Sequence, residues 1–157
     1  MSDLQDVTVR LDDRVRLMSA VLAVTNWPEK SQAEQPHGTH AHSRLTRKTL
    51  ESFKAHPAVQ GLQSLLNLGA PLEAVYTLAL QLSWPELDIE KLPVWVPPRW
   101  NVQLRDFYEQ AGLAKYWRDE DGPWRASIFE AQKMFQPVAF KPFLQPFLGD
   151  IQEKLVF

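Results

Sequence analysis

The chain has 157 residues, enough for one domain whose core needs neither disulfides nor a metal. Lys and Arg total 17 and Asp and Glu total 19, so the net charge of −2 offers no basic field, and we expect neither nucleic acid nor a membrane surface as a partner. The absence of cysteine excludes disulfides, thiolate metal sites and thiol nucleophiles. No signal-peptide pattern and no run of roughly 20 apolar residues is present, which predicts a cytoplasmic protein.

Hydrophobic periodicity predicts a mainly α fold, a single domain over residues 1–157 made of orthogonal or antiparallel helices after a short strand. Residues 7–11 alternate apolar and polar side chains, which predicts the strand, and Asp12 or Asp13 can cap the helix that follows. That helix is expected to end near Trp27 and Pro28. Residues 28–41 are polar, turn-rich and without a period, which predicts a flexible loop.

The middle of the chain predicts a helix from His42 or Ser43 to Pro57, and then two apolar helices over residues 58–83. Gly69 is well suited to end the first of these two helices in a left-handed conformation. We expect the pair to form an antiparallel helical hairpin at the centre of the core.

Residues 85–100 form a loop rich in proline and tryptophan, which we expect to be ordered. The indoles of Trp84, Trp95 and Trp100 are candidate binding residues for a peptide or sugar, since exposed indoles stack on apolar surfaces. The alternative is that they only pack against the core or the loop.

The last third of the chain predicts a helix capped by Asn101, a turn at residues 121–122, and a helix over residues 124–135 that Pro123 begins. Residues 140–149 predict a final helix interrupted by proline. The apolar ending at residues 154–157 is typical either of a chain cut within its structure or of a natural terminus docked in a core.

His37, His40 and His42 are the sharpest candidates for chemistry, because three imidazoles can supply the nitrogen ligands of a tetrahedral zinc. The alternative is a solvated loop that binds metal adventitiously. The sequence lacks a glycine-rich phosphate loop, a Gly-x-Ser-x-Gly elbow and a His-Glu-x-x-His helix. We therefore expect no catalytic residue and no cofactor within residues 1–157.

Five segments occur in a characteristic order: Val9–Met18, Thr49–Val59, Asn67–Leu72, Leu80–Pro85 and Leu104–Tyr108. This order resembles a bacterial family, the domain of unknown function numbered 4932, whose members are similar to zinc metallopeptidases. The resemblance covers roughly residues 7–150, and it implies a helical part that precedes a peptidase core with a His-Glu-x-x-His helix. Because this chain lacks that motif, the resemblance assigns it no catalytic or zinc residue, and any zinc would belong to the rest of a longer protein.

Two functions follow as hypotheses. The chain is the non-catalytic N-terminal helical lobe of a metallopeptidase-like protein, with the 85–100 loop near the substrate cleft, or it is a stand-alone helical module that binds a protein or peptide. A third and weaker hypothesis is metal binding by the histidine loop. Whether the parent protein is an enzyme stays open at this point.

Overall fold

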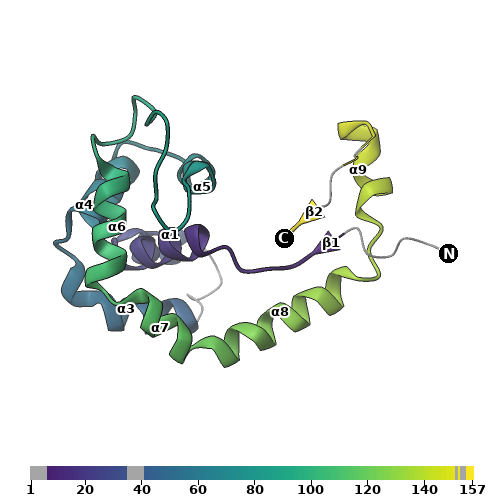
Figure 1. Ribbon diagram of the computed structural model, residues 1–157, viewed down its shortest axis with the longest axis horizontal. Helices are drawn as coiled ribbons and strands as arrows, with labels where there is room; N and C mark the ends of the chain where they lie inside the picture. The colour runs from purple at the N-terminus through teal and green to yellow at the C-terminus, as the bar shows by residue number, and fades with distance from the viewer. Residues whose placement is uncertain (1–6, 35–40, 151, 153–154) are drawn as a thin grey trace. The chain divides into compact units, whose positions relative to one another are not determined.

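A computed structural model describes residues 7–34, 41–150, 152 and 155–157 of the chain. The described residues are mainly helical, which confirms the predicted fold class (Figure 1). In chain order the elements are β1 (Val7–Thr8), α1 (Asp13–Val24), α2 (Trp27–Glu34), α3 (Ala41–Leu50), the 3₁₀ turn η1 (Glu51–Phe53), α4 (Pro57–Asn67), α5 (Leu72–Gln81), α6 (Trp100–Gln110), α7 (Leu113–Asp119), α8 (Asp121–Phe135), α9 (Phe140–Leu148) and β2 (Leu155–Val156).

The chain divides into two compact units, which we describe separately. The helical unit comprises residues 12–115, and the terminal unit comprises residues 1–11 together with residues 116–157. The expectation of a single domain stays a prediction.

The core of the helical unit is built around α1, which packs against α3, α4 and α5, while α4 also packs against α6. Figure 1 shows α4 and α6 side by side. The second half of α1 is almost entirely buried because its side chains are apolar or small on every side of the helix. The largest fully buried side chains come from all of these helices and from the loop before α6: Leu17, Met18, Val21, Leu50, Val59, Leu62, Leu78, Leu87, Trp100, Leu104 and Phe107.

The predicted hairpin over residues 58–83 is only partly correct. Both of its helices form as α4 and α5, and Gly69 follows α4 with a φ of 86°, the left-handed conformation predicted for it. The helix α5 packs mainly against α1, and α4 packs against both α1 and α6, so neither helix packs mainly against the other.

Two charged side chains, Asp12 and Arg14, connect the start of α1 to the end of α5. Asp12 caps α1 by accepting the backbone N–H of Arg14 at 3.0 Å. The guanidinium of Arg14 binds the Asp12 carboxylate and donates to the carbonyls of Leu80 and Leu82 at 2.7 and 3.1 Å. Those carbonyls lie at the C-terminus of α5, where a helix has no backbone donors left for them. Arg14 therefore ties the beginning of α1 to the end of α5.

The flexible loop predicted over residues 28–41 is wrong for its first part, because α2 covers Trp27–Glu34; residues 35–40 lie outside the described residues. Thr25 ends α1 instead, three residues before the proline, and its hydroxyl accepts the backbone N–H of Trp27 at 3.2 Å. Pro28 is then the second residue of α2, where a helix needs no backbone donor.

Other predicted boundaries are also shifted. The helix predicted from His42 or Ser43 to Pro57 ends at Leu50 as α3, and the 3₁₀ turn η1 follows it. The strand predicted over residues 7–11 covers only Val7–Thr8. The helix that Asn101 was expected to cap begins at Trp100, after Arg99 in a left-handed conformation. Asp121 begins α8, so the predicted turn at residues 121–122 is the first turn of the helix, where Pro123 also needs no donor.

The terminal unit contains β1, β2, α8 and α9. The two strands pair in parallel, with Val7 opposite Leu155 and Thr8 opposite Val156. The rings of Phe135, Phe140 and Phe157 lie 5.0 to 5.5 Å apart and join α8, α9 and the residue after β2. No residue of α8 or α9 is buried, although α9 is continuous through Pro146.

Candidate binding loop between α5 and α6

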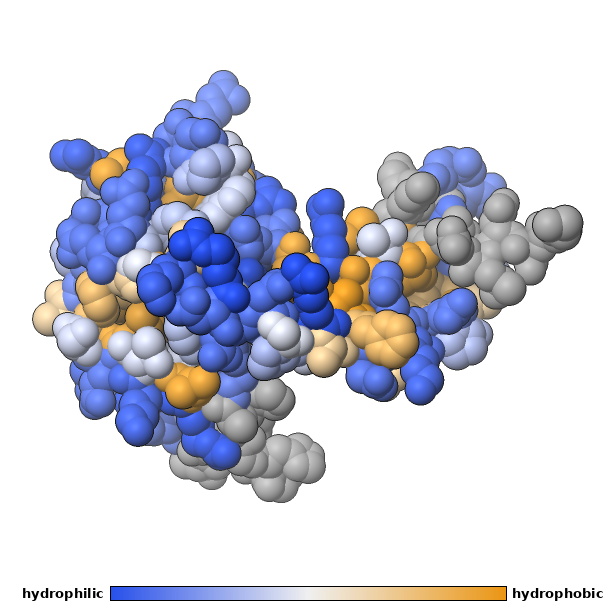
Figure 2. Space-filling view, turned by 60° about the horizontal axis from the view of Figure 1, so that its bottom comes forward, coloured by the Kyte–Doolittle hydropathy of each residue, from blue (hydrophilic) through white to orange (hydrophobic). Residues whose placement is uncertain are grey.

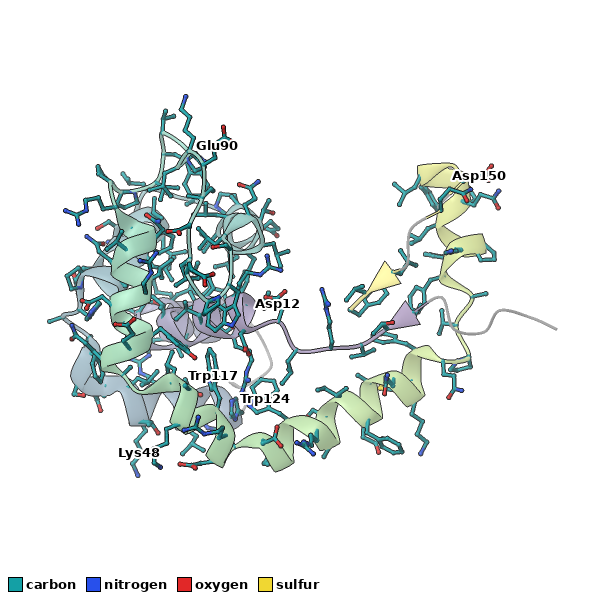
Figure 3. All side chains as sticks on the ribbon, in the orientation of Figure 1. Asp12, Lys48, Glu90, Trp117, Trp124 and Asp150 are labelled. Atoms are coloured by element: carbon teal, nitrogen blue, oxygen red, sulfur yellow. The ribbon has the colours of Figure 1, made fainter. Side chains whose placement is uncertain are left out.

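The Pro/Trp-rich loop predicted at residues 85–100 corresponds to residues 83–99, which connect α5 to α6 and are here called the binding loop. Two apolar side chains anchor it: Leu87 is fully buried, and Val96 is nearly so. Figure 3 labels Glu90, which lies at the outer bend of this loop, away from the helices. The loop is therefore attached at two points of the core and carries its outer bend into solvent.

Hydrogen bonds close the first half of the binding loop into a compact turn. Ser83 donates its backbone N–H to the carbonyl of Asp88 at 2.8 Å, and its hydroxyl accepts the N–H of Asp88 at 2.9 Å. Leu87 donates to the carbonyl of Ser83 at 3.1 Å and has a φ of 55°. A left-handed leucine costs about 1–2 kcal/mol, and burial of its side chain offsets that cost. The Trp84–Pro85 peptide bond is cis.

Side chains of α6 hold the same turn from the other side. The amide of Asn101 donates to the carbonyl of Leu87 at 3.0 Å, which explains why Asn101 does not serve as a helix cap. Arg105 pairs with Asp88 at 2.7 Å, but the Asp88 side chain is largely exposed and such pairs contribute at most about 1 kcal/mol. The first half of the binding loop thus depends mainly on Leu87 and Asn101, and the buried Val96 anchors the second half.

The structure gives the three candidate tryptophans three different roles. Trp100 is fully buried and donates its indole N–H to the carbonyl of Ala58 at 3.0 Å, so its assignment as a binding residue is wrong. Trp84 is half-buried and packs edge-on against Tyr108, with ring centroids 5.0 Å apart. Trp95 is the exposed one, at 42%. Of the three candidate indoles, Trp95 is presented to solvent, and Trp84 and Trp100 are used for packing.

Val94, which precedes Trp95, is 97% exposed, and sequence analysis did not single it out. The sequence feature that could have identified Val94 is the run Pro93-Val94-Trp95. A proline before two large apolar residues in a loop restricts the backbone that presents them. Val94 and Trp95 together form an apolar tip on a loop whose backbone is held by hydrogen bonds. Such a tip can enter an apolar depression on a partner.

The predicted zinc ligands are not brought together in the part of the chain that the structure describes. His37 and His40 lie outside that part, and His42 lies in α3. Among residues 7–34, 41–150, 152 and 155–157, no three His, Cys, Asp or Glu side chains are grouped so that they could hold a metal ion. The histidine loop therefore stays a prediction.

The fourth histidine, His56, has a structural position between two helices. Its Nδ1 accepts the backbone N–H of Ala58 at 3.2 Å and caps α4, and its Nε2 lies 3.2 Å from the carboxylate of Asp106 on α6. The ring is buried and contacts Phe107 edge-on at 5.4 Å. With one nitrogen fixed on a backbone amide, His56 holds α4 against α6 rather than facing a substrate.

None of the described helices combines the length and the apolar character needed to cross a membrane. On α3, Arg47 binds the carboxylate of Glu29 and the carbonyl of Thr25.

No family model, curated protein or solved structure matches this chain. The resemblance to the metallopeptidase-like family therefore stays a prediction.

Proposed function

We propose that this chain is a non-catalytic helical module that binds a protein or peptide through Val94 and Trp95. The observation that carries the proposal is the exposure of an indole and an isopropyl group on a loop that Leu87, Val96 and Asn101 fix in place. Tryptophan is enriched among residues that dominate binding energy, and a loop ordered before binding loses less entropy on contact.

The N-terminal lobe of a metallopeptidase-like protein is a second candidate, supported by the segment order described above. In such a protein the same tip would contact a peptide substrate or the peptidase core. The segments that carry the resemblance contribute to the core of the helical unit, in α1, α4 and α6, so they support a shared fold rather than a shared chemistry.

Selection of displayed peptides tests the binding module without a known partner. A random peptide library is panned against the whole chain and against Trp95→Ala, with Leu68→Ala as a matched control because Leu68 is an exposed apolar residue distant from the binding loop in sequence. We expect peptides that bind the wild type and the control but bind Trp95→Ala at least tenfold more weakly. Sequences that bind all three proteins equally would refute the role of this tip.

The non-catalytic part of the proposal has its own test. The chain is incubated with zinc and a fluorescent casein substrate, and we expect hydrolysis equal to that in buffer with zinc alone. Turnover that requires the chain would contradict this part of the proposal.

A further inference from the structure

The helix α9 carries an apolar face that the rest of the described chain does not cover. Phe140, Phe143, Leu144, Phe147 and Leu148 recur at i, i+3, i+4, i+7 and i+8, the spacing that places side chains on one side of a helix. Phe143, Phe147 and Leu148 are 68%, 76% and 67% exposed. Pro142, Gln145 and Pro146 occupy the other side of the helix, so the apolar face is distinct and continuous.

The exposed face extends beyond α9 itself. Phe140 contacts Phe157, which is 46% exposed. Figure 2 shows hydrophobic side chains at the surface of the terminal unit. We call the surface made of Phe143, Phe147, Leu148 and Phe157 the α9 face.

The α9 face is large enough to serve as half of a dimer interface. With about 200 Å² for a phenylalanine side chain and somewhat less for leucine, its exposed fractions amount to about 500 Å². Monomeric proteins seldom expose an apolar patch much larger than this. Two such faces would bury about 1,000 Å², which is roughly the area that a specific interface requires.

The sequence of α9 is complementary to itself about a two-fold axis. An axis between Gln145 and Pro146 that sets two copies antiparallel places Phe143 opposite Leu148 and Leu144 opposite Phe147, so apolar side chains meet along the face. The macrodipoles of the two helices then run antiparallel, so the positive end of each helix lies beside the negative end of the other, which is favourable.

The charges near the two ends of α9 agree with the same arrangement. The axis that pairs Phe143 with Leu148 also places Lys141 of one copy toward Asp150 of the other. Figure 3 labels Asp150 just beyond the end of α9. Opposite charges therefore meet at both edges and like charges do not, which favours this register.

From the area and this complementarity we propose that a second copy of this chain covers the α9 face, as an antiparallel pair of α9 helices in a two-fold symmetric dimer. The proposal does not depend on the binding loop, which belongs to the other unit.

Sedimentation equilibrium of the whole chain between about 1 and 100 µM tests the proposal, because micromolar interfaces are populated in this range. We expect the wild type to reach the dimer mass. Phe147→Asp places a charge on the α9 face and should weaken the dimer roughly thirtyfold or more. Phe129→Asp is the matched control, since Phe129 is 65% exposed on α8, outside the α9 face, and should leave the dimer intact. Circular dichroism confirms that both variants keep their helix content.

A single cysteine gives a second readout, because the natural chain has none. Phe147→Cys should form a covalent dimer with a short bis-maleimide, and Phe129→Cys should not. A wild type that stays monomeric at 100 µM would overturn the proposal, as would a dimer that tolerates Phe147→Asp or is lost in Phe129→Asp. The variant Trp95→Ala should dimerise normally, so a failure of the binding loop and a failure of the dimer are separate results.

Discussion

Replacement of Gly61 by alanine tests the contact that joins α4 to α6. Gly61 lies inside α4, where alanine usually stabilises a helix by up to about 1 kcal/mol relative to glycine. A Cβ atom at this position would lie 2.7 Å from Nε1 and 2.8 Å from Cδ1 of Trp100. Helix propensity and packing therefore predict opposite signs for one substitution.

The packing effect should be the larger one. The indole must move by more than half an ångström to reach an ordinary contact distance, but Trp100 is fully buried and its N–H is bound to Ala58. Overpacking of this kind costs about 1–3 kcal/mol, and a strained or broken buried hydrogen bond adds about 1 kcal/mol. After the gain in helix propensity, we expect Gly61→Ala to lower the free energy of unfolding by about 1–3 kcal/mol.

Urea denaturation followed by tryptophan fluorescence and circular dichroism measures this change. Gly122→Ala is the control, because Gly122 also lies in a helix, but a Cβ there meets no atom within 4 Å, so we expect no loss of stability. In a Trp100→Phe background the penalty of Gly61→Ala should become smaller without vanishing, since the phenyl ring lacks the Nε1 atom but keeps a carbon at the Cδ1 position. The reasoning is refuted if Gly61→Ala is as stable as the wild type.

Three other substitutions probe helix ends, each by urea denaturation. The side chain of Arg14 holds the pKa of Asp12 below its ordinary value of 3.8, so this ion pair stabilises the fold above that pH and loses its effect as the pH falls below it. The free energy of unfolding of Asp12→Asn should therefore be about 1 kcal/mol lower than that of the wild type at pH 7 and nearly equal to it at pH 3. An equal difference between the two proteins at both pH values would contradict this. His56→Ala removes the cap of α4 and should cost more than His56→Asn, which keeps an acceptor, by about 1 kcal/mol; equal costs would rule out capping. Arg99→Gly should gain about 0.5–1 kcal/mol, because Arg99 has a φ of 60°, and a loss would show that its side chain stabilises the fold.

The boundaries that the sequence predicted well depend on one residue and its neighbours. Gly69 ends α4 because glycine readily adopts a left-handed φ, and Pro57 begins α4 because proline has no N–H to donate. Both effects depend on the residue itself and not on distant parts of the chain. The prediction failed at Pro28, since a proline in the first turn of a helix has the same local pattern as one in a loop. At Pro123 the helix was predicted, but it begins two residues earlier, at Asp121.

The helical class of this protein and most of its helix boundaries were determined by the sequence alone, through apolar periodicity and the residues that start and stop helices. Only the tertiary structure decided which side chains face solvent. Trp95 and Trp100 lie in the same run of prolines and tryptophans, but one is presented on the loop and the other donates to Ala58 across the core. The physical reason is that burial depends on which distant element packs against a residue, and a periodic pattern specifies a face without specifying what covers it.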